Sequence, residues 1–316
     1  MHKYLSPKKY LNRLLLLSNS RVFPFIESFI APKANIPLRH PPIFFLGAPR
    51  SGSTLAIQVI TDVLDVGYLS NRHAQFYGAP GIAEKIFHPT RCRQSSDYRS
   101  NYGVTEGWHA PAEAGLWWYR FFRRCPAYVR IDEVKEKKMI AFRRSVASLT
   151  NAFDRPVFFK NLYASLRIQA ISHYFPESLF IVMHRNEVEN GHSLLEARFK
   201  AFSNYNTWWS MEPPEVKKLK RFQPHEQVIE QIRHIHATIE NDLLLANVES
   251  FRRFDLRYEE FCSDPKAEIT KIKDFLGRNR CSVNYKSTPP SHFDCRKIVR
   301  IDESLHKAMQ NYAKSS

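Results

Sequence analysis

Hydrophobic residues along the chain gather in a few short, dense segments that lack the strict alternation of a half-exposed strand. We interpret four of these segments as strands buried on both faces of a parallel sheet, because such strands are apolar on both sides. The four segments are Ile43–Leu46, Val157–Phe159, Leu179–Met183 and Asp255–Tyr258.

Apolar residues at helical spacing separate these strands. After the first strand, one helical face collects Leu55, Val59, Ile60, Val63 and Leu64. Further on, Asp264 is a typical N-cap, Pro265 suits the first helical position, and Gly277 is expected to end the helix. The buried stripe of that helix comprises Ile269, Ile272, Phe275 and Leu276. Strands that alternate with helices predict an α/β fold, with ligands at the carboxyl ends of a central parallel sheet.

Residues 73–155 depart from this pattern, because they contain few strand signals and many aromatic residues. The aromatic residues include Trp108, Trp117, Trp118, Tyr119, Phe121 and Phe122. We predict a mainly helical insertion over the sheet edge. Core packing is the simpler role for the rings, and the alternative is a platform for a sugar or another flat acceptor. Basic residues interleave with the rings, but no nucleic-acid-binding motif accompanies them, so no nucleic acid partner is predicted.

The composition adds a strong positive charge to this picture. The chain has 316 residues, 43% of them hydrophobic, which is enough for a full core. Lysines and arginines exceed acidic residues by 47 − 31 = 16, so an anionic ligand, polymer or membrane surface is expected. We predict one domain over residues 41–316, including the insertion, after a basic arm over residues 1–40.

The arm is predicted to be neither a signal peptide nor a membrane span. Its longest apolar run is Leu14–Leu17, whereas a span needs about 18 apolar residues and a signal peptide core roughly 7–15. Two roles remain open, namely packing on the domain and peripheral docking on an anionic membrane surface.

Cysteine and histidine spacing bears on location and metal content. The five cysteines are scattered and include no CxxC, which is typical of reduced thiols in a cytoplasmic protein. Neither the cysteines nor the 13 histidines form a recognised metal motif, so no metal is predicted.

The first predicted strand runs into a loop that ends at Thr54 and reads Gly-Ala-Pro-Arg-Ser-Gly-Ser-Thr. Its two glycines, Gly47 and Gly52, have the spacing of a phosphate-binding P-loop. Ser53 occupies the position at which nucleotide triphosphatases carry lysine, and Arg50 lies inside the loop instead. The backbone amides and the following helix N-terminus still suit an oxyanion. The loop is therefore predicted to bind phosphate or a similar group, but not ATP or GTP.

A second anion site is indicated at the end of the Leu179–Met183 strand. Arg185 follows this strand, and Ser193 lies eight positions later on a predicted helix. An arginine at the carboxyl end of a parallel strand faces the ligand crevice and suits bidentate contact with phosphate. Alone, such an arginine is more often a surface or salt-bridge residue, and the preceding loop is what favours phosphate binding.

Taken in order, these motifs resemble the sulfotransferases that use 3′-phosphoadenylyl sulfate. Members of that family commonly show a strand followed by the loop sequence found at Gly47–Thr54, and later a strand ending in arginine with a serine eight positions on. Between them lies a strand ending in lysine, matched by Lys160. Arg-Tyr-Glu and an Asp-Pro helix then follow, matched by Arg257–Glu259 and Asp264–Gly277. The resemblance covers about residues 41–277 and implies a P-loop three-layer fold.

The resemblance also implies a site for the donor. It places the 3′-phosphate on Arg185 and Ser193, the adenine beside Tyr258, and Lys160 beside the bridging oxygen that leaves sulfur in the transition state. The loop residues that would hold the 5′-phosphosulfate are Arg50, Ser51, Gly52, Ser53 and Thr54. The family often has Arg-Asp-Pro where this chain has Arg185-Asn186-Glu187, so the arginine is kept but the turn is changed.

The motifs leave the catalytic base open. Some relatives carry a catalytic glutamate after the helix that follows the loop, but Leu69–His73 contains no carboxylate. His73 is the first candidate, because imidazoles in general titrate at about pH 6.5, a usable range for a base. Glu113 and His109, which lie in the predicted insertion, are the other candidates.

The sequence therefore predicts a sulfotransferase that moves a sulfuryl group from 3′-phosphoadenylyl sulfate to a hydroxyl or amine. The acceptor is expected to be a carbohydrate, a lipid or a small metabolite, and an anionic acceptor would suit the basic chain. Two other classes stay open. One is a P-loop small-molecule kinase, against which Ser53 argues. The other is a nonenzymatic basic protein that binds an acidic polymer, against which the three separate donor motifs argue.

Overall fold

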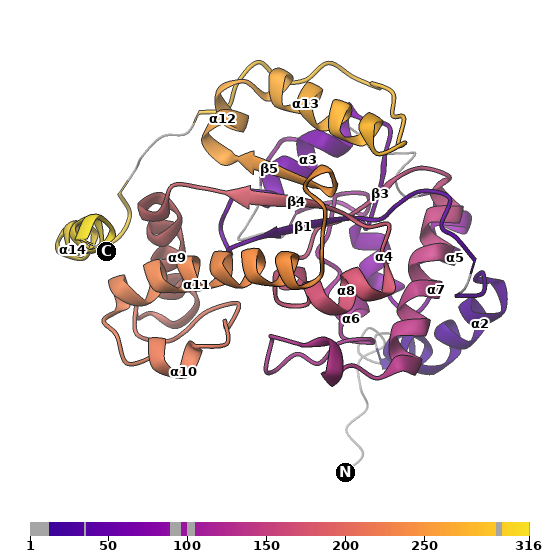
Figure 1. Cartoon of the computed structure of the whole chain (residues 1–316), viewed down its shortest axis with the longest axis horizontal. Helices are drawn as coiled ribbons and strands as arrows, with labels where there is room; N and C mark the ends of the chain where they lie inside the picture. Colours follow the sequence, from indigo (N-terminus) through magenta and orange to yellow (C-terminus); the bar gives the residue numbers. More distant parts are fainter. Residues whose placement is uncertain (1–12, 35, 89–95, 100–104, 295–298, 316) are drawn as a thin grey trace, which may run out of the picture.

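Five parallel strands form the middle layer of the protein, and helices cover both faces of the sheet (Figure 1). The computed structural model describes residues 13–34, 36–88, 96–99, 105–294 and 299–315. In the order β2-β3-β1-β4-β5, the strands are β2 (Gly67–Tyr68), β3 (Val157–Phe159), β1 (Ile43–Gly47), β4 (Leu179–His184) and β5 (Arg253–Arg257). One face carries α3 (Ser53–Val63), α12 (Tyr258–Ser263) and α13 (Pro265–Arg278). The other carries α8 (Ile168–Tyr174), α9 (Glu187–Phe202) and α11 (Pro224–Leu245). This arrangement confirms the predicted three-layer α/β fold.

The central strands follow their apolar pattern, whereas the edge strands do not. Every residue of β1 and β3 is buried, and β4 is buried up to His184. In β5, which lies at an edge of the described sheet, Leu256 alone is buried, so the prediction of burial on both faces was wrong for this strand. Tyr258, expected within that strand, begins α12. The two residues of β2 are too few to show a periodic pattern, and the sequence did not reveal this strand.

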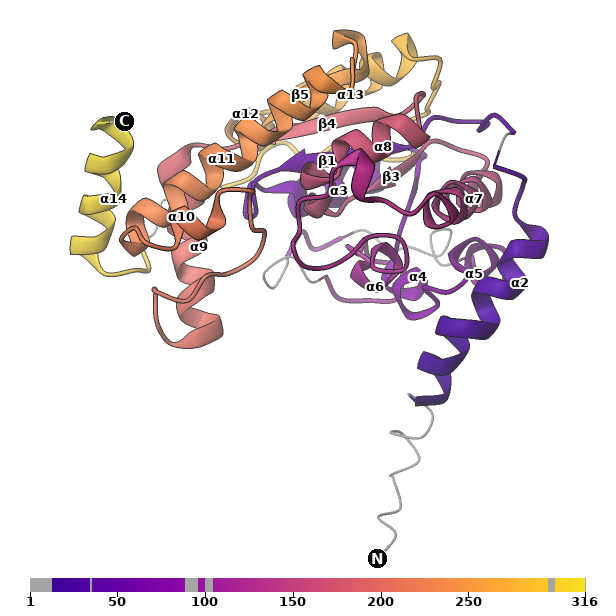
Figure 2. The ribbon, with the colours of Figure 1, turned by 60° about the horizontal axis from the view of Figure 1, so that its bottom comes forward.

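Helices account for much of the segment between β2 and β3, and they gather on the side of the molecule where β3 lies (Figure 2). They are α4 (Asn71–Gln75), α5 (Pro80–Phe87), α6 (Gly115–Trp118), η2 (Ile131–Glu133) and α7 (Glu136–Phe153). Residues 89–95 and 100–104 of the predicted insertion lie outside the described residues.

Several aromatic rings of this segment belong to the core. Trp117 stacks on Phe159 of β3 at 5.4 Å between ring centroids, and Trp118 meets Phe44 of β1 edge-on at 6.0 Å. Both tryptophans are fully buried, whereas Trp108 is 56% exposed. Core packing is therefore the role of the buried rings, and they anchor the insertion to the sheet.

The N-terminal arm is helical over residues 13–30, which include η1 (Ser18–Val22) and α2 (Phe23–Ile30). Its basic residues before Arg13 lie outside the described residues. The buried Glu27 accepts hydrogen bonds from the Gly81 amide (3.1 Å) and the Ser145 hydroxyl (3.1 Å). Burial raises the pKa of the Glu27 carboxyl to about 7. Within the described chain, we find no helix long and apolar enough to cross a membrane.

The C-terminal part completes the two helical layers. The helix α14 (Glu303–Ser315) packs against α9 and α11. The remaining short elements are η3 (Leu162–Leu166), α10 (Val216–Leu219) and η4 (Ser250–Arg252). The helix α13 continues to Arg278, so the prediction that Gly277 ends it was wrong. Arg280 is the residue that takes the left-handed conformation there, with φ of 60°.

Candidate functional site

The loop after β1 depends on both of its glycines. Gly47 has φ of 141°, and a side chain at this position would lie 2.9 Å from the Met183 carbonyl oxygen on β4. Gly52 has φ of 92° and would meet the Tyr258 ring at 2.0 Å. Glycine alone tolerates such close approach together with positive φ. Arg50 also takes a positive φ, 67°, and so the loop turns sharply before α3 begins.

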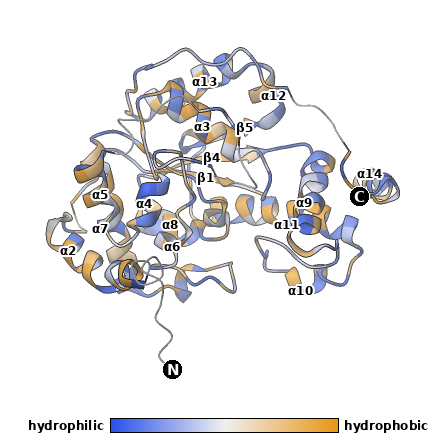
Figure 3. Ribbon diagram, turned by 180° about the vertical axis from the view of Figure 1, so that it is seen from behind, coloured by the Kyte–Doolittle hydropathy of each residue, from blue (hydrophilic) through white to orange (hydrophobic). Residues whose placement is uncertain are grey.

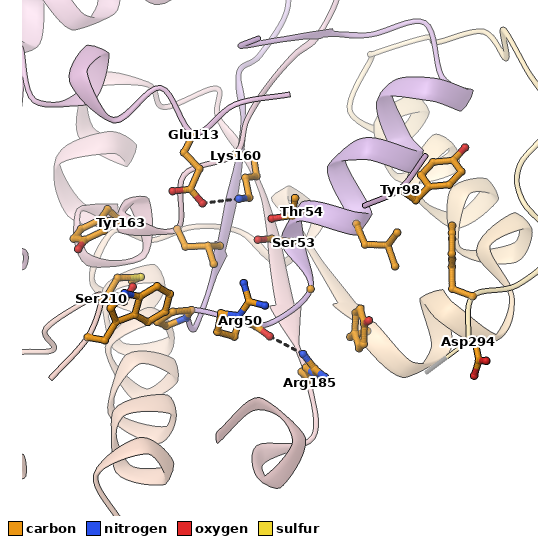
Figure 4. A pocket seen from close by; sticks show the side chains of 18 residues that line it. Arg50, Ser53, Thr54, Tyr98, Glu113, Lys160, Tyr163, Arg185, Ser210 and Asp294 are labelled. Carbon is orange, nitrogen blue, oxygen red and sulfur yellow. Dashed lines mark hydrogen bonds and ion pairs between the residues drawn. The ribbon is translucent and has the colours of Figure 1, made fainter. Parts of the chain in front are cut away.

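A pocket of about 450 Å³ lies where β1, β3 and β4 end (Figure 4). Eight of the residues predicted to form the site line it: Arg50, Gly52, Ser53, Thr54, Glu113, Lys160, Arg185 and Tyr258. Three of these side chains are cationic, and the N-terminus of α3 adds the positive end of a helix dipole. The pocket is therefore suited to an anionic ligand.

Arg185 ties the two predicted anion sites together. Its Nη1 donates a hydrogen bond to the Arg50 carbonyl oxygen at 2.9 Å, and its guanidinium lies 4.6 Å from the Tyr258 ring centroid. Arg185 Nε has no hydrogen-bond partner among the described residues. That Nε is buried, but Arg185 as a whole lines the pocket, so the part of its guanidinium that faces the opening can serve a ligand.

The changed turn after Arg185 still fixes the start of α9. The Asn186 side-chain oxygen accepts hydrogen bonds from the Val188 amide (3.1 Å) and the Glu189 amide (3.2 Å), which caps the helix. The Asn186 amide donates to the Glu259 carboxylate at 2.9 Å. The asparagine therefore takes over the capping that an aspartate would provide.

Two of the three predicted serines, Ser193 and Ser51, do not line the pocket. Ser193 is 8% exposed, and its hydroxyl accepts a hydrogen bond from Arg50 Nε at 3.0 Å. Ser51 is fully buried, and its hydroxyl has no partner among the described residues. In this structure Ser193 therefore supports the loop through its hydrogen bond with Arg50.

Lys160 and Glu113 form an ion pair at the pocket wall. The Lys160 ammonium lies 2.5 Å from a Glu113 carboxylate oxygen (Figure 4). The Lys160 side chain is 4% exposed and the Glu113 side chain 46% exposed, so the carboxylate reaches into the open part of the pocket. Asn161 donates to the Glu113 backbone carbonyl at 3.1 Å, which fixes the segment that carries the glutamate. A buried cation and an accessible carboxylate thus meet at one point.

The structure does not bring His73 into the pocket. His73 is fully buried, and its Nδ1 accepts a hydrogen bond from the Ser70 amide at 2.9 Å, as part of the cap of α4. Its Nε2 lies 3.1 Å from the Glu84 carboxylate. His109, the other histidine candidate, is also outside the pocket lining. A buried capping histidine has no access to an acceptor, so the proposed catalytic base is not His73.

The sequence did not predict one wall of the pocket. It consists of Tyr163, Trp209 and Met211. Gln231 of α11 donates to the carbonyl oxygens of Trp209 (3.2 Å) and Met211 (2.8 Å), which holds this loop in place. An adjacent pair of tryptophans in a polar loop was the only sequence signal for this wall.

A second cavity of about 540 Å³ shares Tyr163, Trp209 and Ser210 with the first. Its other lining residues include Arg124, Cys125, Phe202, Trp208 and Glu212. The two cavities therefore adjoin each other at Tyr163, Trp209 and Ser210. The described residues contain no group of three or more His, Cys, Asp or Glu that could hold a metal ion.

Comparison with known proteins places the chain among one family. A sequence model described as the sulfotransferase family matches residues 41–280. Sulfotransferase STF1 from Mycobacterium tuberculosis H37Rv is 12% identical, with a TM-score of 0.50 over 97% of this chain and 80% of that one. Sulfotransferase STF9 from Mycobacterium avium is 14% identical, with a TM-score of 0.48 over 89% and 69%. At such identity the likeness concerns the fold alone. No curated protein sequence matches the chain.

Proposed function

The chain belongs to the sulfotransferase family, and from this premise we propose that it transfers a sulfuryl group from 3′-phosphoadenylyl sulfate to an acceptor hydroxyl or amine. The observation that carries the proposal is the convergence of Arg50, Lys160 and Arg185 with the α3 N-terminus on one pocket. Such a constellation suits a ligand with two separate anionic groups.

The residues present fit this donor. The loop amides with Ser53 and Thr54 would hold the phosphosulfate, and the Arg185 guanidinium, which lines the pocket, would serve the 3′-phosphate. The Tyr258 ring, which lies directly against Gly52, offers the adenine a flat surface. Ser193 would act through Arg50, because its hydroxyl already accepts from that side chain.

The proposed chemistry is an in-line transfer in which protein groups position and stabilise charge. The acceptor oxygen forms a bond to sulfur while the bond from sulfur to the bridging oxygen breaks. The acceptor proton passes to the Glu113 carboxylate, and Lys160 stabilises the charge that develops on the bridging oxygen. The ion pair between the two side chains places the acid–base group and the cation on the same side of the pocket.

Donor specificity provides the experiment that tests this function. Adenosine 3′,5′-bisphosphate is expected to raise the melting temperature clearly more than AMP or ATP, because a ligand that binds only the folded state stabilises it by mass action. Thermal unfolding with matched ligand concentrations measures this. A larger shift with ATP would favour the kinase alternative, and a shift with heparin alone would favour a nonenzymatic polymer-binding protein.

The second cavity is proposed as the acceptor site. Tyr163 and Trp209 line both cavities, and Arg124 lines the second. This combination suits an acceptor with a flat sugar or aromatic ring and an anionic group. A screen of carbohydrate and phenolic acceptors, each with and without a carboxylate, would identify the class when labelled donor is supplied.

Truncation of the aromatic wall tests this acceptor site. Trp209→Ala is expected to raise the acceptor KM by roughly tenfold or more, because the ring contact is lost, while the donor KM changes little. Its backbone carbonyl, which accepts from Gln231, remains in the variant. Steady-state kinetics with both substrates separate the effects, and Trp108→Ala, which removes an exposed ring outside both cavities, is the control. An unchanged acceptor KM in Trp209→Ala would exclude this placement.

A further inference from the structure

In the part of the arm that the structure describes, one side of the helix is buried against the domain. Asn19 donates to the Gln75 carbonyl oxygen at 2.9 Å and accepts from the Gly78 amide at 2.8 Å. One turn on, the Phe23 ring meets Phe76 with 5.9 Å between centroids. Glu27 completes this buried side. The arm therefore has a fixed orientation relative to the domain, and its other side faces outward.

The outward side is unusually apolar for a surface helix. Its exposed large side chains are Leu14, Leu16, Leu17, Val22, Phe25, Ile26 and Phe29, which we call the arm patch. Phe25 is 64% exposed and Phe29 is 74% exposed, and their rings touch edge-on at 4.8 Å. Figure 3 shows the hydrophobic character of α2 along its ribbon. Exposed apolar patches of this kind mark protein or membrane contacts.

The apolar surface continues onto α5, which lies beside the arm in Figure 2. Phe76, which meets Phe23 of the arm, also contacts Phe87 with 5.2 Å between ring centroids. The α5 side chains Ile86 and Phe87 are 64% and 40% exposed. The arm is thus the longer part of a broader apolar surface.

The charges of the arm indicate which kind of partner could cover the arm patch. Residues 1–40 contain seven lysines and arginines and a single acidic residue, Glu27. Glu27 is buried on the side of α2 that faces the domain. Arg13 and Arg21 are exposed on the arm, and Lys85 is exposed on α5. A second copy of the chain seated on this patch would bring like charges together, which is unfavourable. An anionic lipid surface would instead meet both the cations and the apolar side chains.

We propose that the arm lies in the interface of an anionic lipid bilayer, with the arm patch among the acyl chains and its cations at the head groups. An amphipathic helix binds such a surface through buried apolar area together with electrostatic attraction. Other residues line the donor pocket, so docking leaves the transfer site outside the contact. The membrane contact therefore does not depend on the proposed transfer reaction.

Vesicle co-sedimentation of the full chain tests this proposal. The protein is expected to bind phosphatidylcholine vesicles that contain phosphatidylserine, and to bind pure phosphatidylcholine vesicles much less. A double variant with Phe25→Ser and Phe29→Ser is expected to lower the bound fraction, with a partition coefficient reduced on the order of tenfold or more. Added salt is expected to weaken binding, because the attraction to head groups is screened.

A matched control variant separates the arm from general surface hydrophobicity. Leu244 and Leu245 at the end of α11 are 75% and 61% exposed, and the Leu244→Ser/Leu245→Ser variant is expected to bind vesicles like the wild type. Both variants should keep the wild-type melting temperature, which shows that the arm remains docked. Equal vesicle binding by the two variants would overturn the proposal. A dimer in sedimentation velocity that the arm variant converts to a monomer, without vesicle binding, would assign the patch to a second copy.

Discussion

Glu113→Gln is expected to lower turnover by roughly 10²–10⁴-fold with little change in donor affinity, because the variant keeps the shape of the side chain but cannot accept a proton. The carboxylate lies in the open part of the pocket, 2.5 Å from the Lys160 ammonium, where an acceptor would enter. Steady-state kinetics and binding of adenosine 3′,5′-bisphosphate measure the two quantities separately.

Two further variants show whether this loss is specific to Glu113. Glu106→Gln changes an exposed carboxylate of the same segment outside the pocket lining and is expected to be nearly silent. His73→Ala removes a buried capping side chain, so it should lower the melting temperature while turnover per folded molecule stays close to normal. Normal turnover in Glu113→Gln together with collapse in a folded His73→Ala protein would return the base to His73.

Arg185→Ala is expected to weaken binding of adenosine 3′,5′-bisphosphate by about 10- to 100-fold, because charge-assisted hydrogen bonds contribute about 1.5–3 kcal/mol each. The loss should be much smaller for AMP, which lacks the 3′-phosphate. Part of the effect comes from the loop, since Arg185 also donates to the Arg50 carbonyl oxygen. Arg185→Lys should recover part of the affinity through charge but not the bidentate contact. Isothermal titration with both nucleotides measures these differences.

The controls for Arg185 lie close by in the fold. Arg257→Ala removes an arginine whose side chain is 67% exposed next to Tyr258 and should leave nucleotide affinity unchanged. Ser193→Ala is expected to cost less than Arg185→Ala, because its hydroxyl supports Arg50 behind the pocket lining. If Arg185→Ala weakens both nucleotides equally, the arginine braces the loop and the 3′-phosphate is held elsewhere.

The strands that are most deeply buried were also the ones that the sequence predicted most accurately. The strands β1, β3 and β4 were predictable because they are buried on both faces, which leaves a continuous apolar run in the sequence. The strand β5 was placed only approximately, because at the edge of the sheet it exposes Asp255 and Arg257 and lacks such a run. Residue propensity and hydrophobic periodicity reflect how deeply a segment is buried. They therefore predict strands at the edge of the sheet poorly.

The sequence by itself determined the glycine-bounded loop after β1 and the two cations that follow strands. Gly47 and Gly52 are required by local backbone geometry. Lys160 directly follows one apolar run and Arg185 lies one residue beyond the end of another, so each position can be predicted from its sequence neighbours. Parallel strands bring their carboxyl ends to the same edge, which is why these separate signals converge in space.

Only the tertiary structure decided which groups meet in the pocket and which do not. The Lys160–Glu113 pair joins residues 47 positions apart, and Gln231 fixes Trp209 from a helix 22 positions away. Conversely, His73 stands near the expected position of a base in the sequence, yet the helices of the insertion enclose it. Such contacts depend on how an insertion packs against the sheet. That packing is set by long-range burial of rings such as Trp117 on Phe159, which no local sequence pattern records.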